Sequence, residues 1–227
     1  GCVTVTAKQR NAIWTFGAAD LAEAERVLSI VNKLKTDSPT GDGRADKENT
    51  AVKTDTGWRV STSRPDIVTA LEELCVLDAG SQKKILTPAA FQLDKAGLSQ
   101  LIRGFADADG TVANYSDKSQ YIQLDSCSES LLVQLQVLFL SLAIKAKLYR
   151  DRRALGLTKA LLPDGKGGSK EYDVVQMHSL RISRSSRKVF SHEVGFGNPN
   201  KIVALRKVNK DTQCYKDHLH HPTYMIQ

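Results

Sequence analysis

The sequence predicts an α+β fold built from two similar halves, each with the order ββα, loop, ββα. Short alternating strands and amphipathic helices follow one another in the same order twice along the 227 residues. Short segments also recur at corresponding places in the two halves. The matched segments are residues 1–3 with residues 110–112, Ile13 with Ile122, and residues 59–63 (RVSTS) with residues 181–185 (RISRS). The repeat therefore predicts two halves related by a pseudo-dyad.

The first half is predicted over residues 1–92. The opening GCVTVTAKQRNAIWTFGA is typical of two short strands around a polar turn. Asp20 then precedes a helix, because apolar residues recur at helical spacing between Leu21 and Leu34. Residues 36–50 have loop chemistry, and GWRVSTS alternates like a strand. Pro65 begins the next helix, since proline suits the first helical turn.

The second half is predicted over residues 93–208, and a tail follows over residues 209–227. A helix is expected from about Lys95 to Asp109, and two strands follow within residues 110–126. An apolar helix capped by Ser128 or Ser130 is predicted to reach residue 148. A Gly-rich loop over residues 163–170, two strands within 172–183, a short helix over 187–196 and a helical piece over 201–208 complete this half.

Composition and charge restrict the class of protein. Hydrophobic residues make up 41% and charged residues 25% of the chain, which excludes a wholly disordered protein. The net charge of +7 favours a polyanionic partner, most often nucleic acid, although a merely soluble basic protein has the same charge.

The four cysteines and the apolar segments indicate where the protein resides. The cysteines lie far apart without a CxxC pair, which favours reduced thiols in an intracellular compartment such as the cytoplasm, the nucleus or an organelle. No signal peptide is recognisable at the start of the sequence. The most apolar stretch, residues 131–148, is interrupted by polar residues and predicts a buried helix rather than a membrane span.

Residues 102–110, IRGFADADG, carry the chemistry of the sequence. They predict a helix that ends in two carboxylates and a glycine, with Gly104 and Ala108 on one face where a second helix can approach closely. Asp109 lies at the C-terminal end of this helix, where the helix dipole disfavours a carboxylate. A carboxylate in such a place indicates a bound cation. Asp107 points about 200° around the helix from Asp109, which indicates a structural role.

This segment resembles the motif of the LAGLIDADG homing endonucleases, in a form close to the intein-encoded (dodecapeptide) members. Upstream, KILTP from Lys84 resembles the Lys-Ile-Pro segment before the second motif of the family. Downstream, EVGF from Glu193 and the later Lys201 resemble the family's Ile-Gly-Phe and following lysine. The resemblance implies two pseudo-symmetric ββαββα halves that form a saddle of antiparallel sheets, with the motif helix over residues 98–110 in the second half.

The resemblance also implies a function, the site-specific hydrolysis of double-stranded DNA with a divalent metal, Mg²⁺ or Mn²⁺. Asp109, helped by the Ala108 carbonyl, is the expected metal ligand. Lys84 and Lys201 match the family's lysines and would stabilise developing charge or orient water, the alternative for each being a solvated surface lysine. The cofactor and the DNA partner thus follow from the resemblance.

The same resemblance predicts how DNA would be held, with each four-stranded sheet in the major groove. Side chains that alternate outward along the strands would then reach base edges, and a basic cluster would contact phosphates. The expected base-contacting residues are Lys8, Arg10, Arg59, Ser61, Gln120, Gln123, Arg181 and Ser183. The expected phosphate-contacting residues are Arg150, Arg152, Arg153, Arg184 and Arg187.

One departure from the family bears on activity. A monomeric member has two such motifs, whereas this sequence has one. If the repeat alignment holds, Gly1 is the last glycine of the first motif, whose helix would precede the chain. The protein is therefore expected to act as a monomer with a pseudo-dyad or to pair with the missing N-terminal segment. A truncated or catalytically inactive DNA binder and an RNA-splicing maturase of the same fold stay open as alternatives.

Other interpretations of the motifs fit less well. A glycosyltransferase DxD site at Asp107 and Asp109 would need alternating βα units, which the ββα order does not provide. An EF-hand interpretation of DADGTVANYSD lacks Gly and Glu at the positions that a Ca²⁺ loop requires. The tail, with Cys214 and the histidines at 218, 220 and 221, lacks a second pair of zinc ligands. The tail also resembles, faintly, the remnant of an intein splicing domain without its terminal His-Asn.

Overall fold

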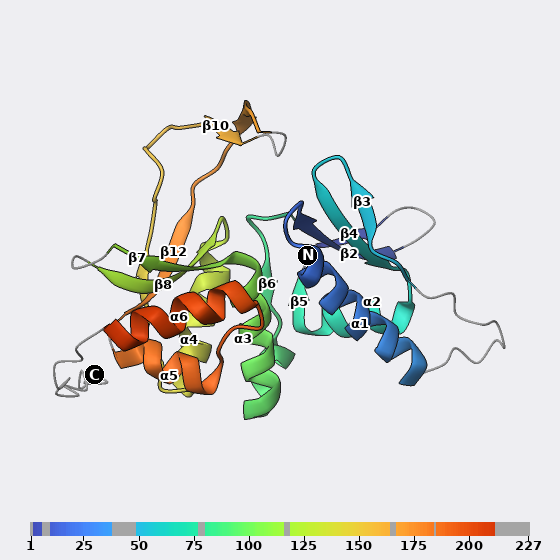
Figure 1. The fold of residues 1–227 in the computed structure, drawn as a ribbon, viewed down its shortest axis with the longest axis horizontal. Coiled ribbons are helices and arrows are strands. Elements are labelled where there is room, and N and C mark those ends of the chain that lie inside the picture. Colours follow the sequence, from blue (N-terminus) through green and yellow to red (C-terminus); the bar gives the residue numbers. More distant parts are fainter. Residues whose placement is uncertain are drawn as a thin grey trace. The chain divides into compact units, whose positions relative to one another are not determined.

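The computed structural model describes residues 2–5, 10–37, 49–76, 80–115, 119–163, 167–183 and 185–211. The chain divides into two compact units (Figure 1). The first consists of Gly1–Gln92 and Arg153–Gln176, and the second of Leu93–Arg152 and Met177–Gln227. The segment from Arg153 to Gln176, predicted to belong to the second half, thus groups with the first unit.

The first unit is built around an antiparallel sheet of four strands in the order β1-β2-β4-β3. Its main elements, in chain order, are β1 (Cys2–Val5), β2 (Arg10–Gly17), α1 (Leu21–Asp37), β3 (Val52–Thr54), β4 (Gly57–Thr62) and α2 (Pro65–Leu74). A short pair, β5 (Cys75–Val76) with β6 (Ile85–Leu86), and the 3₁₀ helix η1 (Pro88–Gln92) follow. A hairpin of β10 (Lys159–Pro163) and β11 (Ser169–Asp173) completes the unit.

The second unit repeats this plan around a sheet with the order β7-β8-β12-β9. Its elements are α3 (Lys95–Asp109), β7 (Gly110–Asn114), β8 (Gln120–Ser126), α4 (Glu129–Ser141), β9 (Lys147–Tyr149), β12 (His178–Ser183), α5 (Ser185–Glu193) and α6 (Pro199–Asp211). The two sheets have the same strand order and the same ββαββα connection. The α+β class and the internal repeat predicted from the sequence are therefore confirmed.

The core of the second unit lies on one face of its sheet, beneath α4 and α5. Ile122 and Leu124 of β8 and Leu180 and Ile182 of β12 are almost completely buried there. An aromatic cluster extends this core, because the ring of Phe190 in α5 lies 6.2 Å from Phe139 and 5.3 Å from Phe196. Alternation along β8 and β12 places their odd-numbered residues on the opposite face, which none of the described helices covers.

Several predicted helices occur where the sequence placed them. Helix α2 begins at Pro65 and α3 covers Lys95–Asp109, as predicted. Of the two caps considered for α4, Ser128 is the one used, since its hydroxyl accepts a hydrogen bond from the Leu131 N–H. Helix α6 continues to Asp211, so the second unit extends past the predicted boundary at residue 208. The remainder of the predicted tail lies outside the described residues.

The predicted extent of the apolar helix was wrong. Helix α4 ends at Ser141, Ala143 takes a φ of 57°, and Lys147–Tyr149 forms strand β9. The Ile144 N–H bonds the Phe139 carbonyl, which closes the end of the helix and buries Ile144. A continuous apolar run fits both a buried helix and a buried strand, and hydrophobicity alone does not show where one becomes the other.

The predicted equivalence of Ile13 and Ile122 was also wrong by one position. Ile122 faces the core and is completely buried, whereas in β2 the buried residue is Ala12. Ile13 lies on the other face of its sheet, opposite Ser61. Because side chains alternate along a strand, a shift of one residue exchanges the two faces. The counterpart of Ile122 therefore lies on the face of Ala12.

Cys75 gives a prediction for stability at alkaline pH. Its thiol is buried, and burial raises the pKa from 9.0 to about 11, while the charge of Lys84 lowers it in part. A raised folded-state pKa means that this contribution to stability is complete below pH 9 and is lost as the pH rises toward 11. We expect the stability advantage of the wild type over Cys75→Ala to shrink across this interval in urea unfolding. A constant difference between pH 8 and pH 11 would contradict this account.

Candidate active site

Helix α3 presents the motif at its C-terminal end. The Asp94 carboxylate caps its first turn by accepting from the Gly97 N–H at 2.7 Å. Leu98, Ile102 and Ala106 are buried and fix the orientation of the helix. Gly110 follows directly, and a Cβ there would lie 2.3 Å from the Ala106 carbonyl oxygen. Only glycine fits at this close approach, where the helix turns directly into β7.

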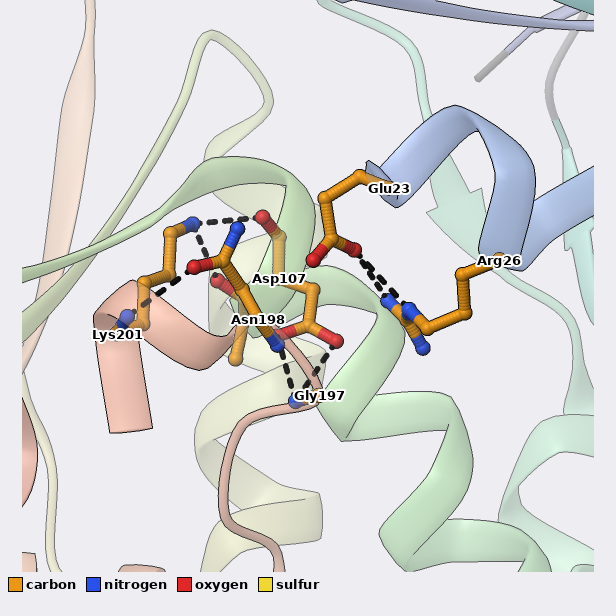
Figure 2. Close-up of polar contacts among 7 residues, drawn as sticks. Glu23, Arg26, Asp107, Gly197, Asn198 and Lys201 are labelled. Carbon is orange, nitrogen blue, oxygen red and sulfur yellow. Dashed lines mark hydrogen bonds and ion pairs between the residues drawn. The ribbon is translucent and has the colours of Figure 1, made fainter. Parts of the chain in front are cut away.

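Asp107 ties this helix end to the segment before α6. Its carboxylate accepts hydrogen bonds from the Gly197 N–H at 2.9 and 3.0 Å and from the Asn198 N–H at 3.1 Å (Figure 2). A carboxylate that accepts several backbone N–H groups stabilises the fold that presents them. The structural role expected for Asp107 is consistent with these bonds.

Lys201 contacts the last turn of the same helix. Its ammonium group donates to the Asp107 carbonyl at 2.6 Å and to the Ala106 carbonyl at 3.1 Å (Figure 2). These carbonyls form the negative end of the α3 dipole, so the lysine offsets their partial charge. The Lys201 backbone N–H in turn donates to the Asn198 side chain at the start of α6. The structure thus brings the Lys201 ammonium group to backbone carbonyls of the motif helix.

Lys201 therefore contributes to stability as well as to the site. We expect Lys201→Met, which keeps the apolar stem, to lower the free energy of unfolding by about 1–2 kcal/mol, since two charge-assisted bonds are lost. Lys207→Met is the control, because Lys207 is exposed on the same helix. Equal urea midpoints for the two variants would show that the ammonium group does not stabilise α3.

Asp109 is exposed, whereas Asp107 is partly buried. No described residue forms a hydrogen bond or an ion pair with the Asp109 carboxylate, and Ala108 beside it is also exposed. Within the described ranges, no three His, Cys, Asp or Glu side chains gather into a metal-binding cluster. One carboxylate with a carbonyl fits Mg²⁺, which keeps several waters and takes its other ligands from substrate phosphates.

Lys84, the other predicted catalytic lysine, belongs to the first unit. It lies directly before β6, partly buried and close enough to Cys75 for its charge to act on that thiol. Asp109 and Lys201 belong to the second unit. A joint role of Lys84 with these two residues stays a prediction.

Three of the four predicted base-contacting residues of the second unit, Arg181, Gln123 and Ser183, lie on the open face of its sheet. Arg181 and Gln123 are paired across β12 and β8, and the Arg181 Nε donates to the Gln123 side-chain oxygen at 2.6 Å. Ser183 is exposed on the same face. The outward orientation predicted for Gln120 was wrong, because it alternates with the buried Ile122 and Leu124 on the core-facing side of β8 and accepts a bond from the buried Arg187.

In the first unit, Arg59 and Ser61 of β4 are exposed on the face opposite the buried Val60. Arg10 forms an ion pair with Glu72. Lys8 lies outside the described residues, as does Arg184 of the second half. Arg59 and Ser61 thus alternate outward, whereas Arg10 lies on the face of the buried Ala12 and pairs with α2, contrary to the predicted orientation. Contact of Arg59 and Ser61 with DNA stays a prediction.

The predicted phosphate-contacting cluster is divided by the structure. Arg150 and Arg152 are exposed, and the Arg150 guanidinium holds the pKa of Glu129 below its usual range. Arg153 donates to the Val175 carbonyl. The prediction for Arg187 was wrong, because this residue of α5 is only 1% exposed and is buried inside the second unit. A guanidinium so placed does not reach a phosphate at the surface.

Sequence reasoning missed the aromatic residues around Arg181. The guanidinium lies 4.4 Å from the ring centroid of Tyr121 on β8 and 4.7 Å from that of Tyr149 on β9. Tyr121 alternates on the same face as Gln123 and could have been placed there from the sequence. Tyr149 could not, because the helix was predicted to reach residue 148 and so hid strand β9 (Lys147–Tyr149).

Comparison with known proteins supports the fold and the motif. A family model described as LAGLIDADG-like domain matches residues 97–195. The solved structure of the homing endonuclease I-DmoI with DNA and Mn has a TM-score of 0.51 at 13% identity, and 86% of this chain and 88% of that chain are covered. The homing endonuclease I-WcaI bound to its DNA recognition sequence has a TM-score of 0.52 at 12% identity, with 90% and 80% covered. Full-length DUF199/WhiA from Thermatoga maritima has a TM-score of 0.50 at 13% identity, with 93% and 56% covered.

Curated relatives match over a limited segment. The ribonucleoside-diphosphate reductase NrdEB subunit alpha of Bacillus subtilis (strain 168) is 35% identical over 102 residues, which are 44% of this chain and 9% of that protein. The large reductase subunit of Invertebrate iridescent virus 6 is 28% identical over 138 residues, covering 53% of this chain and 14% of that protein. The chain therefore spans only about a tenth of the length of these relatives.

The repeated ββαββα units have the LAGLIDADG homing endonuclease fold, and Asp109, at the end of α3, lies within the matched residues. Residues 97–195 match the LAGLIDADG-like domain, and the fold of the chain is similar to that of the homing endonucleases I-DmoI and I-WcaI. Among the helices that the structure describes, none combines the length and apolar character needed to cross a membrane.

Proposed function

We propose that this protein binds a long, specific site in double-stranded DNA and hydrolyses phosphodiester bonds there with Mg²⁺ or Mn²⁺. The observation that carries the proposal is the exposed Asp109 carboxylate at the negative end of α3. Electrostatics alone disfavours a carboxylate at that position, and a bound cation would remove the cost. The related I-DmoI structure contains DNA and Mn, which supports the choice of partner and metal.

Each residue of the proposed site has a separate role. Asp109 and the Ala108 carbonyl would hold the metal, which when bound polarises a phosphoryl oxygen and favours the hydroxide form of water. Lys201 fixes the helix end on which both ligands lie. Lys84 is proposed to stabilise charge that develops on the phosphate. Each sheet would lie in the major groove, with Arg59, Arg181 and their outward neighbours toward the bases.

The element is proposed to derive from an intein. The curated relatives are large reductase subunits, and this chain matches only a small part of each. A LAGLIDADG-like segment within a reductase chain is consistent with an element inserted into a host gene. The same match gives no support to reductase activity in this chain, because nine-tenths of those relatives lie outside it.

A second candidate is a DNA-binding protein of the same fold that does not cut. The sequence contains one motif, and in the described residues one exposed carboxylate ends a motif helix. A lone carboxylate holds a metal weakly unless another chain segment or the substrate adds ligands. The RNA-splicing maturase differs from both in its nucleic acid.

A selection experiment distinguishes these candidates. The purified protein is incubated with randomised duplex DNA and, separately, with randomised RNA, in CaCl₂ and an excess of unspecific competitor. Enrichment of one long duplex sequence supports a DNA-binding function, and cleavage of that duplex on addition of MgCl₂ supports the endonuclease. Enrichment of RNA alone would favour the maturase. No enrichment from either pool would refute the DNA-binding candidates and the maturase alike.

A further inference from the structure

The open face of the second sheet holds one arginine in a fixed orientation. Arg181 lies on β12, the strand between β8 and β9. Tyr121 of β8 is paired with Ser183, and Tyr149 of β9 is paired with Ser179, so the two rings approach Arg181 diagonally from opposite sides. The guanidinium carbon lies 4.4 and 4.7 Å from the two ring centroids, within the range of cation–π attraction.

A series of side-chain hydrogen bonds also restricts the rotation of this guanidinium. Its Nε donates to the Gln123 oxygen at 2.6 Å, and the Gln123 amide donates to the Asp125 carboxylate at 2.8 and 3.0 Å. The buried Ser179 hydroxyl donates to the same carboxylate at 2.5 Å. Gln123 is thereby occupied at both ends of its amide and acts as a positioning residue rather than as a base contact.

The two terminal Nη groups of Arg181 have no hydrogen-bond partner among the described residues. They form a planar pair of donors, which is the geometry that matches the O6 and N7 acceptors of guanine in the major groove. Lys147 and Arg152 lie 5.2 and 5.9 Å from the Tyr149 ring and add positive charge beside the pair. Because the rings and Gln123 hold the fork in advance, little side-chain entropy is lost on binding.

We propose that Arg181 is a specificity-determining residue that recognises one guanine of the duplex through both Nη groups. The proposal rests on the proposed DNA-binding function and assigns a single base pair within the site. The first sheet offers the matched comparison, because Arg59 occupies the related strand β4. Arg59 is exposed, and no aromatic contact or side-chain hydrogen bond joins it to another described residue. An arginine that is free to rotate is expected to discriminate less.

The test compares the wild type, Arg181→Lys and Arg59→Lys in duplex selection, followed by titration of the selected duplex. Both variants keep the charge, but lysine lacks the planar fork. Arg181→Lys is expected to lose preference for one G·C pair by about tenfold to a hundredfold, with other positions unchanged, whereas Arg59→Lys keeps that preference. Replacing the guanine by 7-deazaguanine, which lacks the N7 acceptor, is expected to weaken the wild type about tenfold and Arg181→Lys hardly at all.

Four results would overturn the assignment, and the last of them would also overturn the proposed DNA-binding function. Arg181→Lys could weaken binding to every duplex equally, which would make Arg181 a phosphate contact. The wild type could bind the guanine and 7-deazaguanine duplexes equally, which would exclude a contact with guanine N7. This measurement uses the wild type alone and does not depend on the folding of a variant. The effect of Arg181→Lys could appear only on single-stranded RNA. If the wild type selects no duplex sequence at all, the proposed DNA-binding function fails together with this assignment.

Discussion

Asp109→Asn is expected to lower Mg²⁺-dependent cleavage of the selected duplex by about a thousandfold, because loss of metal stabilisation worth about 4 kcal/mol corresponds to that factor. Asparagine keeps the size of the side chain and removes only the charge. In the absence of metal the same change should raise the free energy of unfolding by about 0.3–1 kcal/mol, since a negative charge leaves the negative end of α3. Loss of activity with a gain in stability identifies a residue kept for function.

Binding provides the control for this variant. In CaCl₂, Asp109→Asn should retain the sequence preference of the wild type, because the sheets that contact the bases are unchanged. Nuclease rates are measured on a labelled duplex, and stability is measured by urea unfolding in EDTA. Cleavage by the variant at the wild-type rate would exclude Asp109 as a metal ligand. A marked loss of stability would mean that the residue is structural.

Asp107→Ala should have the opposite outcome, a loss of about 2–3 kcal/mol in the free energy of unfolding. Its carboxylate accepts from the Gly197 and Asn198 N–H groups, and the variant leaves these partly buried donors without their acceptor. The segment before α6 would then be held less firmly against α3. Urea unfolding of Asp107→Ala beside Asp109→Ala makes the comparison at two carboxylates of one helix end. Equal midpoints for the two variants would contradict these separate roles.

The sequence predicts most helices because their signals are local. Pro65 sets the start of α2, Asp94 and Gly110 delimit α3, and Ser128 caps α4. Strand pairing is not local, and one error in register moves a side chain to the other face of a sheet. Ile13 shows this, since its assignment to the face of Ile122 fails although both lie within correctly predicted strands.

The sequence could predict those features of the candidate site that depend only on the geometry of helix α3. The angle between Asp107 and Asp109 around α3 separates a bonded carboxylate from an exposed one. The partners of Lys201 could not be foreseen, because its bonds to the Ala106 and Asp107 carbonyls join segments far apart in sequence. Burial of Arg187 was likewise hidden, since a basic residue early in a helix is ordinarily exposed.

The most direct test of the central claim is cleavage of a randomised duplex library in MgCl₂, with the wild type and Asp109→Asn assayed in parallel. We predict that the wild type cuts or nicks one long sequence and that Asp109→Asn binds that sequence and leaves it intact. Equal cleavage by the two proteins, or binding by the wild type without any cut in Mg²⁺ or Mn²⁺, would contradict the assignment of Asp109 as the metal ligand of an endonuclease.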